Sequence, residues 1–290
     1  MLLLQLLING IQLGALYALT AAGFSLIFGS TRVFHFAHGS AFAIAAYLFY
    51  FFYAVAGAGW PVAALAATVA AVVFGVAVDR FIYAPIQRHE GSFFTVFVAS
   101  FGIAIVVQNL IGMIFGRGFV SVPTALSRSI EITPGLYVSP LAGIAILCAV
   151  AFFVGLHLFL TRTHVGFALR ALAENPELVR TYGLSPRLLS SYAFALGSLL
   201  VVPSALLTSA STGLNPAVGS DIMLVSLAAT IVGGVGSLRG AACAGLLLGL
   251  GQNLALWRLV SQWSDAVTFV VLFLFILFRP SGFFGRAVTS

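Results

Sequence analysis

The chain contains no lysine, and this absence excludes several mechanisms. A P-loop ATPase needs the lysine of its glycine-rich loop, and a pyridoxal enzyme needs a lysine for its Schiff base. The chain alone is therefore not expected to hydrolyse ATP by the P-loop route. Charge is scarce as well: charged residues make up 7% of the 290 positions, and all 13 basic ones are arginines.

Metal-binding and catalytic patterns are also lacking. Cys148 and Cys243 both fall in apolar runs, which favours small core residues over a disulfide framework or a metal site. His35 and His38 lie close together but lack a third ligand, so structural hydrogen bonding is favoured over metal binding. G-x-S-G, G-x-G-D and H-E-x-x-H are missing. We therefore expect no cofactor, no metal and no enzyme activity.

Long apolar runs are what the chain has instead. The sequence is 61% hydrophobic, and its runs approach the 20 or so residues that cross a bilayer. They cover residues 6–29, 40–57, 61–81, 93–114, 140–160, 188–210, 222–237, 240–256 and 266–279. This pattern predicts an all-α polytopic membrane protein, one domain over 1–290 with about eight or nine transmembrane helices. The first run is expected to be an uncleaved membrane helix, and 222–256 two half-helices or a re-entrant pair.

The arginines predict the orientation. If the stretch Thr161–Arg187 is cytoplasmic, ten arginines fall inside and three outside, as the positive-inside rule requires. The inside set is Arg32, Arg80, Arg88, Arg162, Arg170, Arg180, Arg187, Arg239, Arg279 and Arg286, and the outside set is Arg117, Arg128 and Arg258. The N-terminus is then outside and the C-terminus cytoplasmic. The net charge of +6 is thus interpreted as a signal of orientation, and no nucleic-acid partner is expected. The external loop 116–139 is expected to hold a short helix or strand.

The stretch Thr161–Arg187 concentrates charge that hydrocarbon rejects, at roughly 2.5–3.5 kcal/mol for each buried charge. Asn175, Pro176 and Glu177 form a helix start, and Gly183 is a typical helix stop. The short helix between them carries an apolar stripe of Leu178, Val179 and Tyr182 beside Arg180. Upstream, 167–173 is predicted to be helical with Leu169 and Leu172 exposed. Two interpretations stay open: the stripe rests in lipid headgroups, or it enters a groove on a soluble partner.

Polar residues inside the apolar runs are candidates for a translocation path. The candidates are Asn9, Gln12, His38, Gln108, Asn109, Thr230, Gln252 and Asn253. For any one of them, hydrogen bonding between helices is the favoured alternative. Two small-residue spacings, Gly10-x-x-x-Gly14 and Gly245-x-x-x-Gly249, are predicted to pack helices within the chain, with an oligomer contact as the alternative.

Four stretches carry a family resemblance. Residues 168–186 (ALRALAENPELVRTYGLSP) resemble the cytoplasmic coupling loop of ABC-importer permeases of the branched-chain amino-acid (LivH) type. Residues 36–39 (FAHG) are similar to the family's N-F-A-H-G, 233–240 (GGVGSLRG) to its G-G-x-G-S-x-x-G, and 278–285 (FRPSGFFG) to its R-P-x-G-L-F-G. The resemblance spans nearly the whole chain. His35 stands where the family usually has Asn, and Arg239 where it commonly has Pro.

The resemblance implies a transporter of several different subunits in a bacterial inner (plasma) membrane. This chain would be the permease, paired with a homologous second permease, two ATPase subunits and an external solute-binding protein. The solute would be a branched-chain or other amino acid, with urea or a short amide as further members of the range. Coupling to the ATPase is assigned to Arg170, Glu174, Asn175, Glu177, Leu178, Val179, Arg180, Tyr182 and Gly183. A stand-alone channel or facilitator for a small neutral solute, or a membrane scaffold, is the alternative function.

Overall fold

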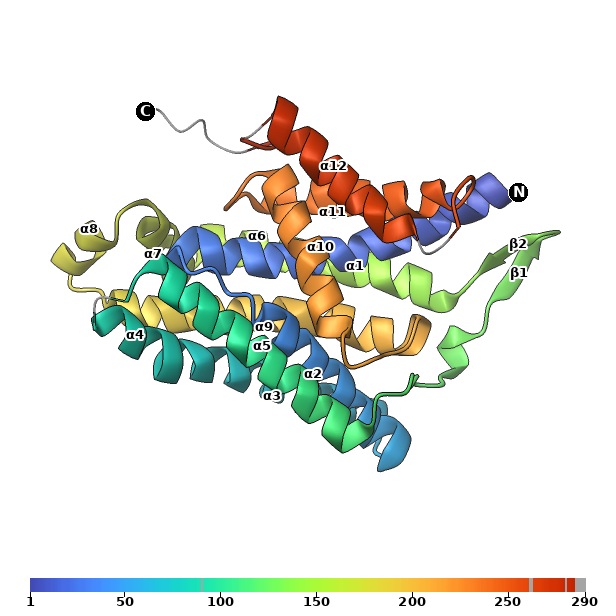
Figure 1. Cartoon of the computed structure of the whole chain (residues 1–290), viewed down its shortest axis with the longest axis horizontal. Helices are drawn as coiled ribbons and strands as arrows, with labels where there is room; N and C mark the ends of the chain where they lie inside the picture. Colours follow the sequence, from blue (N-terminus) through green and yellow to red (C-terminus); the bar gives the residue numbers. More distant parts are fainter. Residues whose placement is uncertain (90, 261–262, 280, 285–290) are drawn as a thin grey trace.

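The computed structural model describes residues 1–89, 91–260, 263–279 and 281–284 as a bundle of helices with one short hairpin of strands (Figure 1). The helices are α1 (Leu2–Thr31), α2 (His38–Tyr50), α3 (Trp60–Val78), α4 (Ala84–Arg88), α5 (Phe93–Phe115), α6 (Pro140–Arg162), α7 (His164–Glu174), α8 (Pro176–Thr181), α9 (Pro186–Ser211), α10 (Val218–Gly233), α11 (Leu238–Ala255) and α12 (Ser264–Phe278). Strands β1 (Ile130–Thr133) and β2 (Leu136–Val138) pair antiparallel. π-helical turns extend α2 and join α3 to α4.

Six helical segments of the described chain are long and apolar enough to cross a membrane. They are Leu2–Thr31, His38–Val55, Trp60–Arg88, Phe93–Phe115, Pro140–Arg162 and Pro186–Ser211. α10 and α12 are apolar but shorter, at 16 and 15 residues. The predicted polytopic α-helical architecture is confirmed. The count of eight or nine spans and the orientation stay predictions, and 285–290 at the C-terminus lie outside the described residues.

α1 lies at the centre of the bundle and packs closely against α11. The two glycine spacings face each other: a Cβ on Gly14 would lie 2.8 Å from the Cα of Leu246, and one on Gly245 would lie 2.5 Å from the Cα of Ala18. Gly249 has no room for a side chain beside Gly14. Small residues let helix backbones approach in this way. The predicted packing within the chain is confirmed.

α10 and α11 meet at the glycine-rich turn. Gly234 and Gly236 have φ angles of 97° and 79°, a conformation that glycine adopts without steric cost. Gly233 and Gly240 touch backbone to backbone, so a Cβ on either would overlap the other residue. The glycines therefore allow a tight turn and a close approach of α10 and α11, and the interpretation of 222–256 as half-helices or a re-entrant pair stays a prediction.

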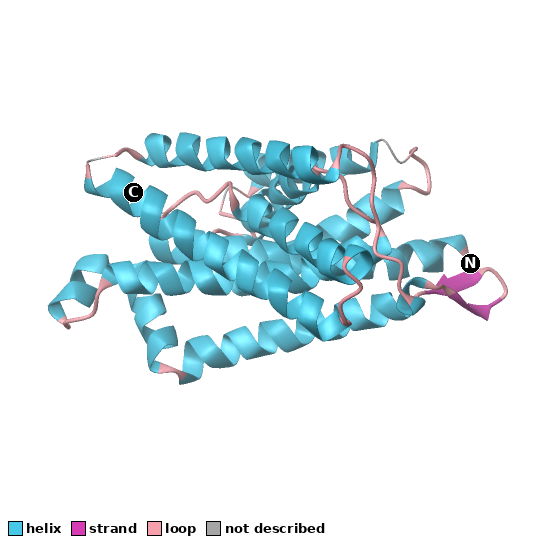
Figure 2. Cartoon of the chain, turned by 90° about the horizontal axis from the view of Figure 1, so that it is seen from below, coloured by secondary structure: helices cyan, strands magenta, loops and turns pink. Residues whose placement is uncertain are grey.

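The two ends of the bundle differ. The N-terminus and the β1–β2 hairpin lie at one end, and α7 and α8 lie at the opposite end (Figures 1 and 2). The Gln5 side chain joins the start of α1 to the hairpin, because it donates to the Tyr137 carbonyl and accepts from the Tyr137 N–H, both at 2.8 Å. The hairpin and a short turn at Ala125–Ser127 confirm the local structure expected in loop 116–139.

Candidate functional site

Two short capped helices, α7 and α8, form from the polar stretch. The Thr163 hydroxyl accepts from the Gly166 N–H at 3.0 Å at the start of α7. The Asn175 side-chain oxygen accepts from the N–H groups of Glu177 and Leu178, each at 3.0 Å, at the start of α8. These bonds satisfy amides that a helix start leaves without partners. The predicted helix start at Asn175 is confirmed.

α8 ends in a double hydrogen-bonded stop. Gly183 has a φ of 76°, its N–H donates to the Arg180 carbonyl at 3.0 Å, and the Leu184 N–H donates to the Val179 carbonyl at 3.2 Å. This is the Schellman arrangement, which favours glycine at the left-handed position. The predicted stop at Gly183 is confirmed. Ser185 then caps α9 by accepting from the Leu188 N–H at 3.5 Å, so local bonds hold both ends of α8.

The inner face of α7 and α8 belongs to the core of the bundle. Leu169, Leu172 and Val179 are 1%, 4% and 2% exposed and join one apolar cluster with Leu160 of α6 and Leu189 of α9. The prediction that Leu169 and Leu172 are exposed is wrong, and Val179 is not part of an exposed stripe. The physical reason is that α7 folds back onto α6, and this packing buries the face of α7 that carries Leu169 and Leu172.

Gly166 permits this return of α7 onto α6. A Cβ at Gly166 would overlap the Phe159 carbonyl and lie 2.6 Å from the Cα of Leu160. The close approach lets the inward leucines of α7 replace water with apolar contacts, worth about 1.5–3 kcal/mol for each fully buried side chain. The polar stretch is therefore a packed part of the fold rather than a tether.

The outer face of the same segment stays apolar and open. Leu178 is 51% exposed and Tyr182 is 77% exposed. They belong to a groove of about 550 Å³ between α7, α8 and the start of α9. The groove is lined by His164, Val165, Phe167, Ala168, Ala171, Leu178, Val179, Tyr182, Leu184, Ser185, Leu188, Leu189 and Tyr192. A large exposed apolar surface of this kind marks an interaction site.

Charged side chains accompany the groove without lining it. Arg170, Glu174, Glu177 and Arg180 are exposed on α7 and α8. The Arg170 guanidinium lies 4.7 Å from the centre of the Phe167 ring, which holds that aromatic side chain at the surface. An apolar surface bordered by charge is typical of protein interfaces.

Four of the path candidates form hydrogen bonds inside the helix bundle. His38 donates to the Thr20 carbonyl at 3.0 Å, and Thr230 donates to the Ala21 carbonyl at 3.3 Å. Gln252 accepts from the Tyr17 hydroxyl at 2.8 Å and donates to Thr268 at 2.7 Å. Asn253 donates to the Gly249 carbonyl at 3.1 Å. The bonds of His38, Thr230 and Gln252 each join two different helices, so these side chains stabilise the packing between helices.

Three other candidates lie at the bundle surface. Asn9 is exposed and accepts from Gln5 at 3.0 Å, and Gln12 is half-buried. Asn109 is exposed and donates to the Ile105 carbonyl of its own helix at 2.9 Å. Among the described residues, no hydrogen bond joins Asn9, Gln12 or Asn109 to the buried candidates.

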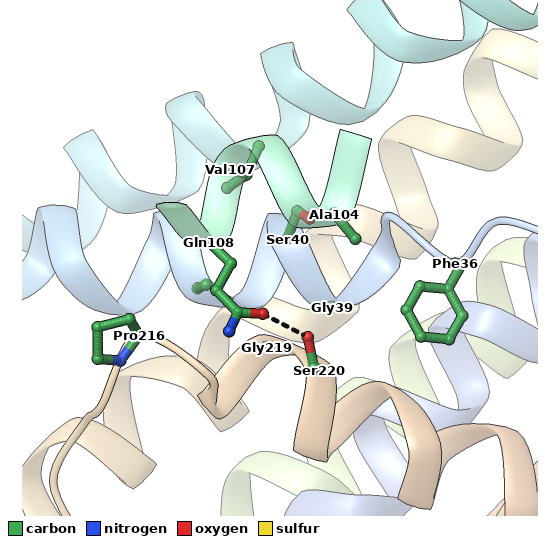
Figure 3. Close-up of a pocket in the computed structure, with 10 residues that line it drawn as sticks. Phe36, Gly39, Ser40, Ala104, Val107, Gln108, Pro216, Gly219 and Ser220 are labelled. Atoms are coloured by element: carbon green, nitrogen blue, oxygen red, sulfur yellow. Dashed lines mark hydrogen bonds between the residues drawn. The ribbon is translucent and has the colours of Figure 1, made fainter. Parts of the chain in front are cut away.

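Among the path candidates, Gln108 lines a pocket of the described chain between α2, α5 and α10 (Figure 3). Its side-chain oxygen accepts from the Ser220 hydroxyl at 3.0 Å. The pocket measures about 10 Å³ and is lined by Phe36, Gly39, Ser40, Ala43, Ala104, Val107, Gln108, Pro216, Gly219 and Ser220. Its polar groups thus come from three separate parts of the chain.

The two serines of the pocket were not singled out from the sequence. A signal was nevertheless present, because Ala37-His-Gly-Ser40 and Ala217-Val-Gly-Ser220 share the pattern Ala-x-Gly-Ser. Both stretches begin a helix, α2 and α10. Gly39 and Gly219 touch backbone to backbone, and a Cβ on either would overlap the carbonyl of the other.

His35, at the position where the resembling family has Asn, is fully buried and does not line the pocket. Its Nδ1 shares a hydrogen bond of 2.9 Å with the Tyr83 hydroxyl. In the part of the chain that the structure describes, no group of three or more His, Cys, Asp or Glu side chains is arranged to hold a metal ion.

Comparison with known proteins agrees with this architecture. Residues 6–276 match the family described as branched-chain amino acid transport system / permease component. The permease protein BraD of Pseudomonas aeruginosa, from a high-affinity branched-chain amino acid transport system, is 31% identical over 98% of this chain and 96% of its own length. The corresponding LivH permease of Escherichia coli K12 is 27% identical over the same shares of each chain.

A solved structure shares the fold. A chain of PsaBC from Streptococcus pneumoniae, determined in complex with a Fab, aligns with a TM-score of 0.53 at 14% identity. The alignment covers 97% of this chain and 92% of that chain. The match to the permease family extends over the helices that build both the groove and the pocket. The chain therefore belongs to the branched-chain amino acid transport permease family, whose members are transport subunits rather than enzymes.

Proposed function

We propose that this permease is the membrane subunit of an ABC importer for a small polar solute in a bacterial inner membrane. A branched-chain or other amino acid is the first candidate solute, and urea or a short amide is the second. Two ATPase subunits, a homologous second permease and an external solute-binding protein complete the assembly. The N-terminus and the hairpin face outside, and α7 and α8 face the cytoplasm, as the arginine distribution favours.

The observation that carries the proposal is the rigid, capped α7–α8 segment with its open apolar groove. Leu178 and Tyr182 are exposed although both ends of α8 are held by local hydrogen bonds. Exposed apolar groups on a fixed support favour contact with a rigid partner surface. Such a contact transmits movement of the ATPases to α6 and α9, because the inner face of the segment is buried against those helices. A stand-alone channel would not make such a contact with ATPases.

The substitution Leu178→Asp tests the proposal. An unpaired carboxylate in the contact should cost several kcal/mol, and about 3 kcal/mol weakens assembly by roughly a hundredfold. Thr181→Asp is the matched control, because Thr181 lies on the same helix, is exposed and does not line the groove. Assembly is measured by co-purification of the ATPases, and coupling by ATP-driven uptake in proteoliposomes.

We expect Leu178→Asp to keep its expression level and helical content while losing the ATPases and uptake. Thr181→Asp should assemble as the native chain does. Normal assembly and uptake by Leu178→Asp would mean that the apolar face only rests on lipid, and the proposal would then be wrong. No copurifying ATPase for the native chain would favour the stand-alone channel instead.

A further inference from the structure

Three hydrogen-bond donors of residues that line the pocket of Figure 3 have no acceptor among the described residues. Ser40 is 5% exposed, and its hydroxyl has no partner among the described residues. The Gly219 N–H and the Gln108 amide nitrogen also have none within the described chain. No Asp or Glu lines the pocket. Gln108 is half-buried, whereas Ser40 is almost fully buried. Because buried polar groups are normally paired, the open Ser40 hydroxyl beside the Gly219 N–H indicates a ligand that accepts hydrogen bonds.

The N-termini of α2 and α10 meet beside the same space. Their first turns are in contact through Gly39 and Gly219. α2 begins at His38, and the His38 side chain is hydrogen-bonded to the Thr20 carbonyl of α1. Thr20 lies eleven residues, or about 16 Å, before the end of α1. Gln108 lies seven residues, or about 10 Å, from the end of α5. Both positive helix ends thus lie within the depth of the membrane, where their partial charges are poorly screened.

We propose that this pocket binds the carboxylate of the solute as the solute passes through the permease. A carboxylate only accepts hydrogen bonds, which matches the donor set of Ser40, Gly219 and Gln108. Broken helices in other transporters aim their N-termini at anionic solute groups for the same electrostatic reason. The proposal rests on the proposed function and narrows its solute to a carboxylate-bearing compound such as an amino acid.

The hydrogen bond between α5 and α10 closes the pocket. At about 10 Å³ the space has room for about one water molecule, so a carboxylate enters only when α5 and α10 separate. Separation breaks the bond from Ser220 to Gln108, and both side chains then donate to the carboxylate. Asp221 follows Ser220 but lies about 100° further round α10 and does not line the pocket.

Gln108→Glu tests the proposal in the complete transporter, with all subunits in proteoliposomes. The substitution preserves the shape of the side chain and places a negative charge where a carboxylate would bind. Gln87→Glu is the matched control, because it makes the same chemical change at an exposed position on α4 that does not line the pocket. The probes are L-leucine, which has a carboxylate, and urea, which has none. ATP hydrolysis stimulated by loaded binding protein reports assembly separately from uptake.

We expect Gln108→Glu to reduce leucine uptake at least tenfold while its stimulated ATP hydrolysis stays within twofold of the native complex. Gln87→Glu should keep both leucine uptake and ATP hydrolysis within twofold of the native complex. If Gln108→Glu fails to assemble, Ser40→Ala decides the question, with an expected three- to tenfold loss of leucine uptake. Native uptake of leucine by either variant overturns the proposal. A native complex that carries urea but not leucine also overturns it and leaves the permease function intact. If the native complex carries neither probe and shows no ATP coupling, the proposed function itself fails.

Discussion

The contact between α1 and α11 makes a quantitative test of the fold possible through Gly245→Ala. A Cβ at position 245 would lie 2.5 Å from both the N and the Cα of Ala18, whereas ordinary contacts of a Cβ begin near 3.4 Å. The added Cβ would also lie 2.9 Å from the Cβ of Ala18. Because backbone atoms and a Cβ cannot rotate away, the two helices must move apart by about 1 Å. Overpacking of this kind costs about 1–3 kcal/mol.

The same movement weakens a hydrogen bond further along the contact. The Tyr17 hydroxyl donates to Gln252 at 2.8 Å, and its loss adds about 1 kcal/mol. Replacement of glycine by alanine recovers up to about 1 kcal/mol of helix propensity. The net destabilisation of Gly245→Ala is then about 1–3 kcal/mol, which for a chain of this size lowers the thermal midpoint by about 5 °C.

Gly251→Ala is the control for that measurement. It lies on the same helix, but its Cβ would meet only Val267 at 3.5 Å, an ordinary contact. Thermal unfolding in detergent, followed by size-exclusion chromatography, should show Gly251→Ala at or above the native midpoint and Gly245→Ala several degrees below it. Equal thermal midpoints for the two variants would refute the close contact between α1 and α11. The alternative, in which the glycine spacing forms a contact between subunits of an oligomer, would then be favoured.

Two other predictions follow from the two ends of the bundle. Gly166→Val should displace α7 from α6, because the added side chain would overlap the Phe159 carbonyl. The variant should still insert into the membrane, but its solute uptake should fall at least tenfold. Native uptake by this variant would contradict the packing of α7 against α6. In a chain without its two cysteines, Glu177→Cys should react with an impermeant thiol reagent only from the cytoplasm and Ile130→Cys only from outside, because each position is exposed at its own end of the bundle. Reaction of both from one side would show that the orientation is wrong.

The sequence by itself determined the features that depend on neighbours within a few positions. The caps of α8 could be predicted because Asn175 bonds amides two and three residues ahead, and Gly183 accepts a backbone conformation that other residues resist. The apolar runs determined the membrane class for a similar reason, since each helix must satisfy its own backbone in lipid.

Tertiary structure alone decided which faces and which polar residues meet. α7 offers leucines that look equally free in the sequence, yet packing against α6 and α9 buries Leu169 and Leu172 while α8 leaves Leu178 open. Gln108 and Gln252 are chemically alike, but one closes a pocket against Ser220 and the other joins α1, α11 and α12. Such pairings join residues far apart in the chain. They depend on how whole helices cross, which local composition does not encode.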